Sequence, residues 1–383
     1  MSLKKVIITL LCGLVMPFAF SCKKTGGDAI KVGAILSQTG PASFLGAPEA
    51  KTLQMMADEI NSNGGIDGKA IDLIIKDSAG DPEKAISFAK QLIEEEKVFA
   101  ILGPSTSGES MKIKGICEEA KTILISCAAA EVIVNPVARY VFKTPQNDRL
   151  AAERIYDVMK KKGISRIGVV SSNDGFGLAG KEQLEKLAPS KGITIAISEV
   201  YDKKATDLTG VLTKLKARGV QAVINWSIVP AQSIVAKNMK QLNMNIPLFQ
   251  SHGFGNIKYV TEAGAAAEGI IFPASRLLIA ESLPEDNPQK AVLVKYKQDY
   301  ESKFNEDVST FGGHAYDAML ILTEAVKKAG ADSEKVREAI ESIKGLAGTG
   351  GVFNFSAEDH NGLDINAFEM LTVKGGKFVK YEQ

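Results

Sequence analysis

The chain is poor in the residues on which metal sites and nucleophilic catalysis most often depend. Its 383 residues include only four cysteines and three histidines. It contains no His-Glu-x-x-His pair, no Gly-x-Ser-x-Gly elbow and no cysteine spacing typical of a zinc site. The sequence therefore predicts no metal site and no cofactor, and it argues against an enzyme.

An excess of charge of one sign is also absent. Lysine and arginine number 46 and aspartate and glutamate 45, a formal net charge of +1. No basic stripe or acidic tail is present, so electrostatic attraction to a polyanion has little support. We expect no nucleic-acid partner.

The one apolar run that concerns a membrane is short and N-terminal. Lys4 and Lys5 precede an apolar stretch over residues 6–20, which is too short to span a bilayer comfortably. This arrangement is typical of an export signal. We predict a signal peptide over residues 1–21 and an extracytoplasmic protein.

Two fates of the new N-terminus fit the residues around Cys22. Ala19 and Ser21 are small, as signal cleavage requires, and ordinary cleavage would release a soluble protein. The segment also resembles a bacterial lipobox, from which Phe20 departs, and Cys22 would then be lipidated. We favour a lipid anchor at Cys22, with residues 22–29 ("CKKTGGDA") as a tether. Cys117 and Cys127 are interpreted as small buried apolar residues, and a disulfide between them stays open.

Short apolar runs alternate with amphipathic stretches from Ile30 onward. "IKVGAIL" is typical of a strand, and "PEAKTLQMMADEINS" places Leu53, Met56 and Ile60 at helical spacing. Strands that alternate with helices predict parallel sheets covered on both faces, the doubly wound α/β class. A second series of strands starts with "RIGVVSS", which predicts a second domain, and "KGGK" near the C-terminus predicts a hairpin.

Several segments together resemble a known family. They are "IKVGAILSQTGPASFLG", "INSNGGIDGKAIDLIIKDSAGDPEKA", "ILGPSTSGES", "LISCAAA", "FKTPQND", "NDGFGLAG" and "GHAYDAMLILTEAVKKAG". The chain from about Ile30 to Gln383 is similar to the type I periplasmic binding proteins of the leucine/isoleucine/valine-binding class, the solute receptors of ABC importers.

This resemblance implies two lobes joined by a three-strand hinge. Lobe 1 would comprise residues 30–147 and 276–350, and lobe 2 residues 148–275 and 351–383, with hinges near 145–149, 273–276 and 351–354. A small molecule would bind between the lobes, at the carboxyl ends of the strands. A monomer that hands its ligand to ABC permease subunits is the expected assembly.

The first candidate ligand residues follow the lobe 1 strands. "GPSTSGES" places Ser105 and Ser107 at a predicted helix N-terminus, which suits a carboxylate, although either serine could simply cap the helix. The resemblance implies a backbone contact at Ala128 and places Ala130 where amino-acid receptors usually carry threonine. Asp148 matches an acid at the rim of the family's site, or it caps the following helix.

The remaining candidates are mostly apolar. Where the amino-acid receptors present tyrosines, this chain has Leu45, Phe176 and, beside Trp226, Ile228. Phe44 and Phe311 are predicted to add aromatic walls, although core packing is the usual fate of such residues.

His252, in "LFQSHGFGN", is the sharpest departure from the family. The resemblance implies an acid here that pairs with the ammonium of an amino acid. Without that acid a buried ammonium lacks a partner, so the hypothesis is a small apolar acid, oxo acid or amide reached by His252, and an amino acid stays open as the alternative ligand. The competing interpretation is a structural ring that bonds its own loop, with Gln250 as an alternative contact.

Other features are assigned less specific roles. "GFGLAG" matches a dinucleotide fingerprint, but four residues separate it from the preceding strand, so nucleotide binding is rejected. His314 is predicted at the surface or as a helix cap, and His360 in a turn. Besides an importer receptor, an exported sensing subunit for a membrane signalling partner stays open.

Overall fold

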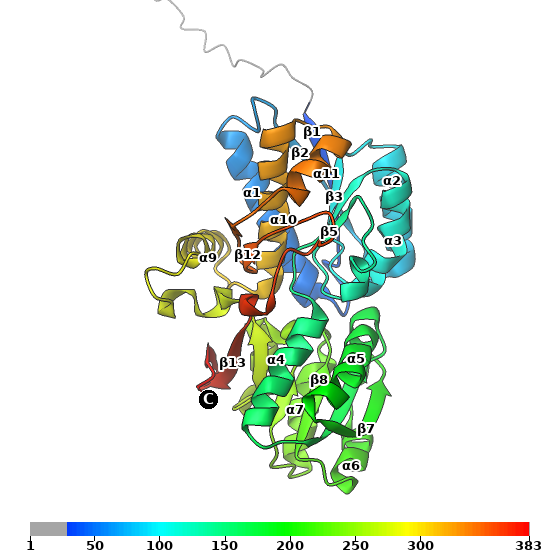
Figure 1. Cartoon of the computed structure of the whole chain (residues 1–383), viewed down its shortest axis with the longest axis vertical. Coiled ribbons are helices and arrows are strands. Elements are labelled where there is room, and N and C mark those ends of the chain that lie inside the picture. Colours follow the sequence, from blue (N-terminus) through cyan, green and yellow to red (C-terminus); the bar gives the residue numbers. More distant parts are fainter. Residues whose placement is uncertain (1–28, 383) are drawn as a thin grey trace, which may run out of the picture.

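Two sheets built mainly of parallel strands organise the chain, because its apolar runs are short and most are followed by a helix. In the computed structural model, which describes residues 29–382, they form an upper and a lower lobe (Figure 1). The upper sheet, in lobe 1, has the order β2-β1-β3-β4-β5 and is parallel throughout. Its strands are β1 (Ile30–Leu36), β2 (Ile71–Asp77), β3 (Ala100–Leu102), β4 (Ile123–Ser126) and β5 (Val141–Lys143).

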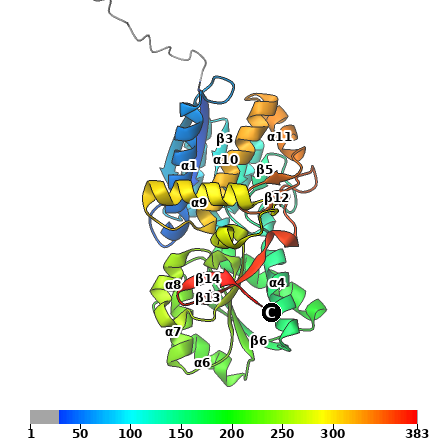
Figure 2. The ribbon, with the colours of Figure 1, turned by 90° about the vertical axis from the view of Figure 1, so that its left-hand side faces the viewer.

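Helices cover both faces of this sheet, as the doubly wound class requires. Val32, Ala34 and Leu36 of β1 pack with α1 and α10, whereas Ile35 packs with α2 and α3. The helices of lobe 1 are α1 (Ser43–Ser62), α2 (Pro82–Glu94), α3 (Ser107–Glu119), α9 (Lys290–Phe304), α10 (Thr310–Ala329) and α11 (Ser333–Glu341). Figure 2 shows α9 lying across the lower part of this lobe.

The lobe 2 sheet is larger and mixed, with the order β14-β13-β10-β9-β8-β6-β7. Its parallel strands are β6 (Arg166–Ser172), β7 (Thr194–Tyr201), β8 (Ala222–Trp226), β9 (Leu248–Gln250) and β10 (Ile271–Ala274). The antiparallel strands β13 (Glu369–Lys374) and β14 (Lys377–Lys380) confirm the predicted hairpin. Gly375 and Gly376 form its turn with φ of 57° and 75°, a conformation that glycine adopts without strain.

Five helices surround this second sheet: α4 (Asp148–Lys161), α5 (Gly175–Leu187), α6 (Thr209–Ala217), α7 (Ala231–Gln241) and α8 (Ile257–Ala263). α4 packs with α5, and α7 packs with α6 and α8. Short 3₁₀ turns complete the chain: η1 (Glu131–Ile133), η2 (Ala188–Lys191), η3 (His252–Phe254), η4 (Gly264–Ala266), η5 (Arg276–Ser282) and η6 (Ile365–Ala367).

The chain passes between the lobes at three places, and the third lies later than the expected 351–354. The first follows β5, and the second follows β10. Before the third, β12 (Val352–Phe353) pairs with β11 (Leu346–Ala347). Phe353 and Phe355 stack on each other, and Phe355 meets Phe142 of β5 edge-on. This aromatic cluster keeps the chain in lobe 1 well beyond residue 350, and the lobe 2 sheet resumes only at Glu369.

The lobes touch where the N-termini of α3 and α5 face each other. Gly108 of α3 lies against Gly175 of α5, and a Cβ atom placed on Gly175 would lie 2.7 Å from the Cα and N atoms of Gly108. No side chain fits at that distance, so backbone meets backbone across the cleft.

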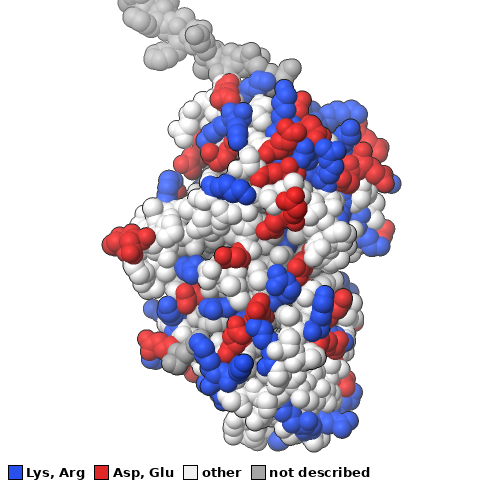
Figure 3. Space-filling view, in the orientation of Figure 1, with Lys and Arg blue, Asp and Glu red and all other residues white. Residues whose placement is uncertain are grey.

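Charged side chains are intermixed over the face seen in Figure 3. Within residues 29–382 no helix is both long and apolar enough to cross a membrane. Cys117 and Cys127 are buried and unbonded to each other, as expected of small apolar residues. The predicted signal peptide and Cys22 lie outside the described residues.

Candidate functional site

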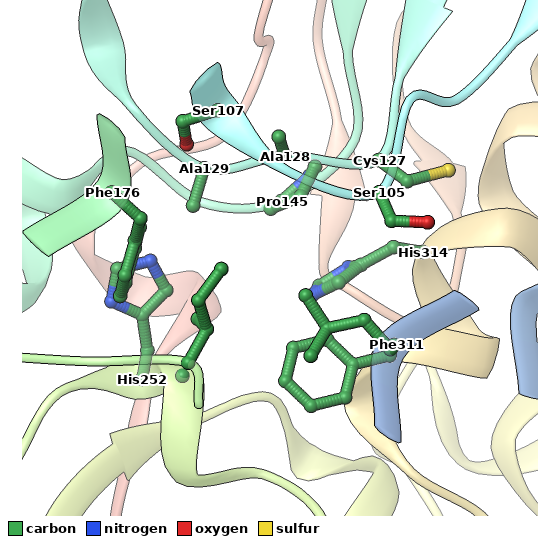
Figure 4. A pocket seen from close by; sticks show the side chains of 13 residues that line it. Ser105, Ser107, Cys127, Ala128, Ala129, Pro145, Phe176, His252, Phe311 and His314 are labelled. Carbon is green, nitrogen blue, oxygen red and sulfur yellow. The ribbon is translucent and has the colours of Figure 1, made fainter. Parts of the chain in front are cut away.

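A cavity lies between the lobes (Figure 4). It opens at the carboxyl ends of strands of both sheets, where ligands of open α/β sheets bind. Both lobes contribute to its wall, which consists of Leu45, Ser105, Ser107, Cys127, Ala128, Ala129, Pro145, Phe176, Ile228, His252, Gly253, Phe311 and His314.

Most of the candidate residues from the sequence lie on this wall. Those that do are Leu45, Ser105, Ser107, Ala128, Phe176, Ile228, His252 and Phe311. Phe44, Ala130, Asp148 and Trp226 are not among the lining residues. Phe44 packs on Tyr259 with a ring separation of 5.2 Å, and Trp226 lies behind Phe176 at 5.8 Å. These two aromatic residues therefore support the cavity from outside its wall.

Ser107 presents a polar atom on the lobe 1 wall. Thr106 caps α3: its hydroxyl accepts the Glu109 N–H at 3.4 Å and donates to the Glu109 carboxyl group at 2.6 Å. The Oγ atom of Ser107 accepts the Ala130 N–H at 3.3 Å, so its own O–H stays available as a donor. The N–H groups of the first helical turn lack intrahelical acceptors. This end of the cavity therefore suits a carboxylate.

Ser105 is more fully engaged than Ser107. Its hydroxyl accepts the Ser37 N–H at 3.0 Å and donates to the Glu49 carboxyl group. Burial raises the pKa of Glu49 to about 8, so this carboxyl group is protonated at neutral pH. Ser105 thus has little hydrogen-bonding capacity left for a ligand.

His252 is enclosed by aromatic rings and has no hydrogen-bond partner. It is 6% exposed, and its ring lies 5.3 Å from Phe176, 5.6 Å from Trp226 and 5.5 Å from Phe368. Among the described residues, neither ring nitrogen is bonded, which contradicts a structural ring bonded to its own loop. Burial lowers the pKa of His252 well below its usual range, and the charge of Lys143 lowers it further, so the ring is neutral.

Gln250 is not the alternative contact that the sequence allowed. Its side chain accepts a hydrogen bond of 2.7 Å from Asn225 and donates one of 3.2 Å to the Gln232 carbonyl. It is absent from the residues that line the cavity. Gln250 therefore belongs to a buried polar network of lobe 2.

His314 is a site residue that the sequence interpretation missed. It is 5% exposed and lines the cavity, rather than lying at the surface or capping α10. Its Nδ1 atom has no partner in the part of the chain that the structure describes, and burial lowers its pKa to about 3. Helical spacing puts it on the same face as Phe311 and Ala318, a signal that could have located it.

His360 is buried as well, which corrects its assignment to a simple turn. Its ring stacks on Phe142 with a centroid separation of 4.1 Å. The Nδ1 atom is paired with the Val141 carbonyl at 2.9 Å, and Nε2 lies 3.3 Å from a carboxylate oxygen of Glu341. Unlike the other two histidines, it has partners for both nitrogens and serves the core of lobe 1.

Lys143 carries a cationic group behind the wall of the cavity. Its Nζ atom donates to the carbonyls of Ala129 at 3.1 Å and Pro145 at 2.7 Å. Burial lowers its pKa to about 7, although the negative charge of Asp148 acts to raise it. The Asp148 carboxylate accepts the Glu131 and Arg149 N–H groups at 3.0 Å each. Asp148 therefore stabilises the first crossover. It does not line the cavity, and within α4 it accepts only the Arg149 N–H.

The glycines of "GFGLAG" serve packing. A Cβ atom on Gly177 would lie 2.0 Å from the Ser172 carbonyl oxygen, and one on Gly180 would lie 2.0 Å from Nε1 of Trp226. These glycines let α5 approach β6 and β8 closely. Across residues 29–382, no group of three or more histidine, cysteine, aspartate or glutamate side chains is arranged to hold a metal ion.

Comparison with known proteins gives relatives over nearly the whole chain. The "Leucine-, isoleucine-, valine-, threonine-, and alanine-binding protein" of Pseudomonas aeruginosa is 25% identical over 360 residues, 91% of this chain and 92% of the relative. The Leu/Ile/Val-binding protein BraC3 of Rhizobium johnstonii is 23% identical over 387 residues, covering both chains completely.

Solved structures show the same fold. An extracellular ligand-binding receptor from Rhodopseudomonas palustris superimposes with a TM-score of 0.87 at 28% identity, covering 92% of this chain and 99% of that one. A branched-chain amino acid transporter substrate-binding protein from Streptococcus pneumoniae, in complex with isoleucine, gives 0.80 at 26% identity, with coverage of 91% and 97%. The periplasmic binding protein family model matches residues 29–377. The chain therefore belongs to the periplasmic binding protein family and is a solute-binding receptor, not an enzyme.

Proposed function

We propose that this receptor binds a small apolar carboxylate, oxo acid or amide between its lobes and delivers it to ABC permease subunits at the extracytoplasmic face of the membrane. One observation carries the choice of ligand. The cavity wall contains two histidines and no aspartate or glutamate. An anionic or neutral ligand fits such a wall, and a free amino acid does not.

A buried ammonium group without a partner is energetically costly. An ion that loses water and gains no partner is penalised by several kcal/mol. Glu49 lies behind Ser105 and is protonated, so it supplies no negative charge at neutral pH. Lys143, whose pKa is about 7, is increasingly protonated below that pH; its charge lowers the pKa of both His252 and His314 and would repel an ammonium as well.

A set of isosteric ligands tests this proposal. We would remove bound ligand by unfolding and refolding, then measure affinities for leucine, 4-methyl-2-oxopentanoate and 4-methylpentanoate by calorimetry. These compounds share a carbon skeleton and differ at the second carbon. Binding of either acid with leucine at least tenfold weaker supports the proposal. Tight binding of leucine with none of the acids would overturn it.

Membrane attachment is tested separately. We infer that Cys22 is lipidated and that the tether of residues 22–29 holds a monomeric receptor near its permease. Mass spectrometry of the mature N-terminus, purified from membranes, should give an acylated Cys22. A free chain cleaved after Ser21 would show the alternative, a soluble receptor.

A further inference from the structure

The unpaired polar groups of the cavity lie at two separate ends. At one end Ser107 and His252 lie on the same side of the cavity as Phe176, which packs against His252 (Figure 4). At the other end His314 lies near Phe311, with a ring separation of 6.5 Å. Figure 4 shows His252 and His314 on opposite sides of the cavity.

The two ends are joined by an apolar middle. Leu45 from lobe 1 and Ile228 from lobe 2 line it, and a Cβ atom on Gly253 would lie 2.7 Å from Ile228 and 3.1 Å from Phe176. Gly253 therefore cannot carry a side chain without displacing these neighbours. Because Leu45 and Ile228 are apolar, they suit a ligand with an apolar body.

His314 has unused hydrogen-bonding capacity at its end. Ser105, its polar neighbour on the wall, is engaged with Ser37 and Glu49. The Nδ1 atom of His314 is buried without a partner in the described chain. A neutral imidazole offers one donor and one acceptor, and buried polar atoms are nearly always satisfied. The Nδ1 atom of His314 is therefore free to hydrogen-bond a group of the ligand.

We propose that the ligand carries oxygen at both ends: a carboxylate held by Ser107 and His252, and a hydroxyl or carbonyl oxygen at the far end of its apolar body held by His314. This inference rests on the proposed function and makes it more specific. The two histidines come from different lobes, so a ligand with both oxygens bridges the lobes.

Matched pairs of acids test the far oxygen. We would measure by calorimetry the affinities of hexanoate and 5-oxohexanoate, and of phenylacetate and 4-hydroxyphenylacetate. The second member of at least one pair should bind about tenfold more tightly than the first. Replacing His314 by leucine should reduce that ratio to about two or less, whereas His314→Gln, which keeps a donor and an acceptor, should retain part of it.

His360→Gln provides the matched control, because it removes a buried histidine that does not reach the cavity. It should leave the ratio within each pair unchanged, and circular dichroism would verify that each variant is folded. Equal affinities within both pairs, or a preference that survives His314→Leu, would overturn the inference while leaving the proposed function intact. If no acid binds, the proposed function and the inference both fail.

Discussion

The two walls of the cavity differ in how they are made. Lobe 1 contributes serines, alanines and a helix N-terminus, whereas lobe 2 contributes Phe176, Ile228 and a histidine surrounded by rings. The lobe 1 wall offers hydrogen bonds from fixed positions, and the lobe 2 wall excludes water. Because electrostatic interactions strengthen when water is excluded, closure of lobe 2 makes the lobe 1 contacts tighter. In the proposed binding mode, lobe 1 supplies the Ser107 donor and the helix N-terminus, while lobe 2 supplies His252 and the rings that keep water away from the carboxylate.

An acidic side chain on the lobe 2 wall should have the largest effect on ligand affinity. In His252→Glu a carboxylate would face the carboxylate of the ligand, and like charges in close contact cost several kcal/mol. We expect affinity for the best acid to fall by more than about a hundredfold, and binding of leucine to improve. Calorimetry with His252→Gln as the neutral control separates charge from shape. An equal loss in both variants would contradict the electrostatic explanation.

Removing the donor of the lobe 1 wall should have the next largest effect. Ser107→Ala deletes one hydrogen bond to a charged group, which contributes roughly 1.5–3 kcal/mol. Affinity for a bound acid should fall by about tenfold or more, measured by calorimetry. Thr106→Ala weakens the cap of the same helix without removing a lining side chain, and it should lower the midpoint of thermal unfolding more than it lowers affinity.

The protonated carboxyl group behind the lobe 1 wall should leave a signature in the pH dependence of stability. The pKa of Glu49 is about 8 in the folded protein and 4.5 for the free side chain. As pH rises between these values, the unfolded chain loses the proton first, so the free energy of unfolding falls by about 1.4 kcal/mol per pH unit. Glu49→Gln should abolish this contribution.

Urea unfolding of both proteins at pH 5, 6, 7 and 8 measures it, because the contributions of other titrating groups cancel in the difference between them. The wild-type protein should lose stability relative to Glu49→Gln as the pH increases. Parallel curves would show that Glu49 is ionised in the folded protein.

The smallest effect is expected on the apolar wall. Phe176→Leu keeps most of the buried area and loses the edge contact to His252 and the tilted contact to Trp226; such aromatic pairs contribute about 0.5–1.5 kcal/mol. Affinity for an acid should fall by about threefold to tenfold. Leu178→Ala, at an exposed position on the same helix, is the control and should not change affinity.

The strands, the two sheets and the final hairpin could be predicted because each depends on a local pattern of apolar and turn residues. The strand "IKVGAIL" is a clear case, since its alternate residues face different helices of lobe 1. The third crossover could not be placed, because Phe353 and Phe355 are equally compatible with either core and only their contact with Phe142 decides.

The candidate site shows the same limit. Residues that follow strands, such as Ser107 and Phe176, were found because strand ends converge at one edge. His314 was missed because it lies inside a helix: its spacing with Phe311 and Ala318 places it on the buried face, but that spacing does not show that the face borders a cavity. The role of Lys143 depends on its hydrogen bonds to the carbonyls of Ala129 and Pro145, and no sequence pattern predicts such contacts.

The contact between Gly108 and Gly175 limits how far the lobes can close. One added methyl group, in Gly175→Ala, would act as a wedge there, because the alanine Cβ would fall 2.7 Å from the opposing backbone while alanine suits the start of α5 well. The wedge lies beside the cavity and not on its wall. The Gly175→Ala protein would keep every side chain of the cavity wall, but its lobes would stay apart when the ligand is bound. It would therefore show whether a permease responds to the bound ligand or to the closed lobes.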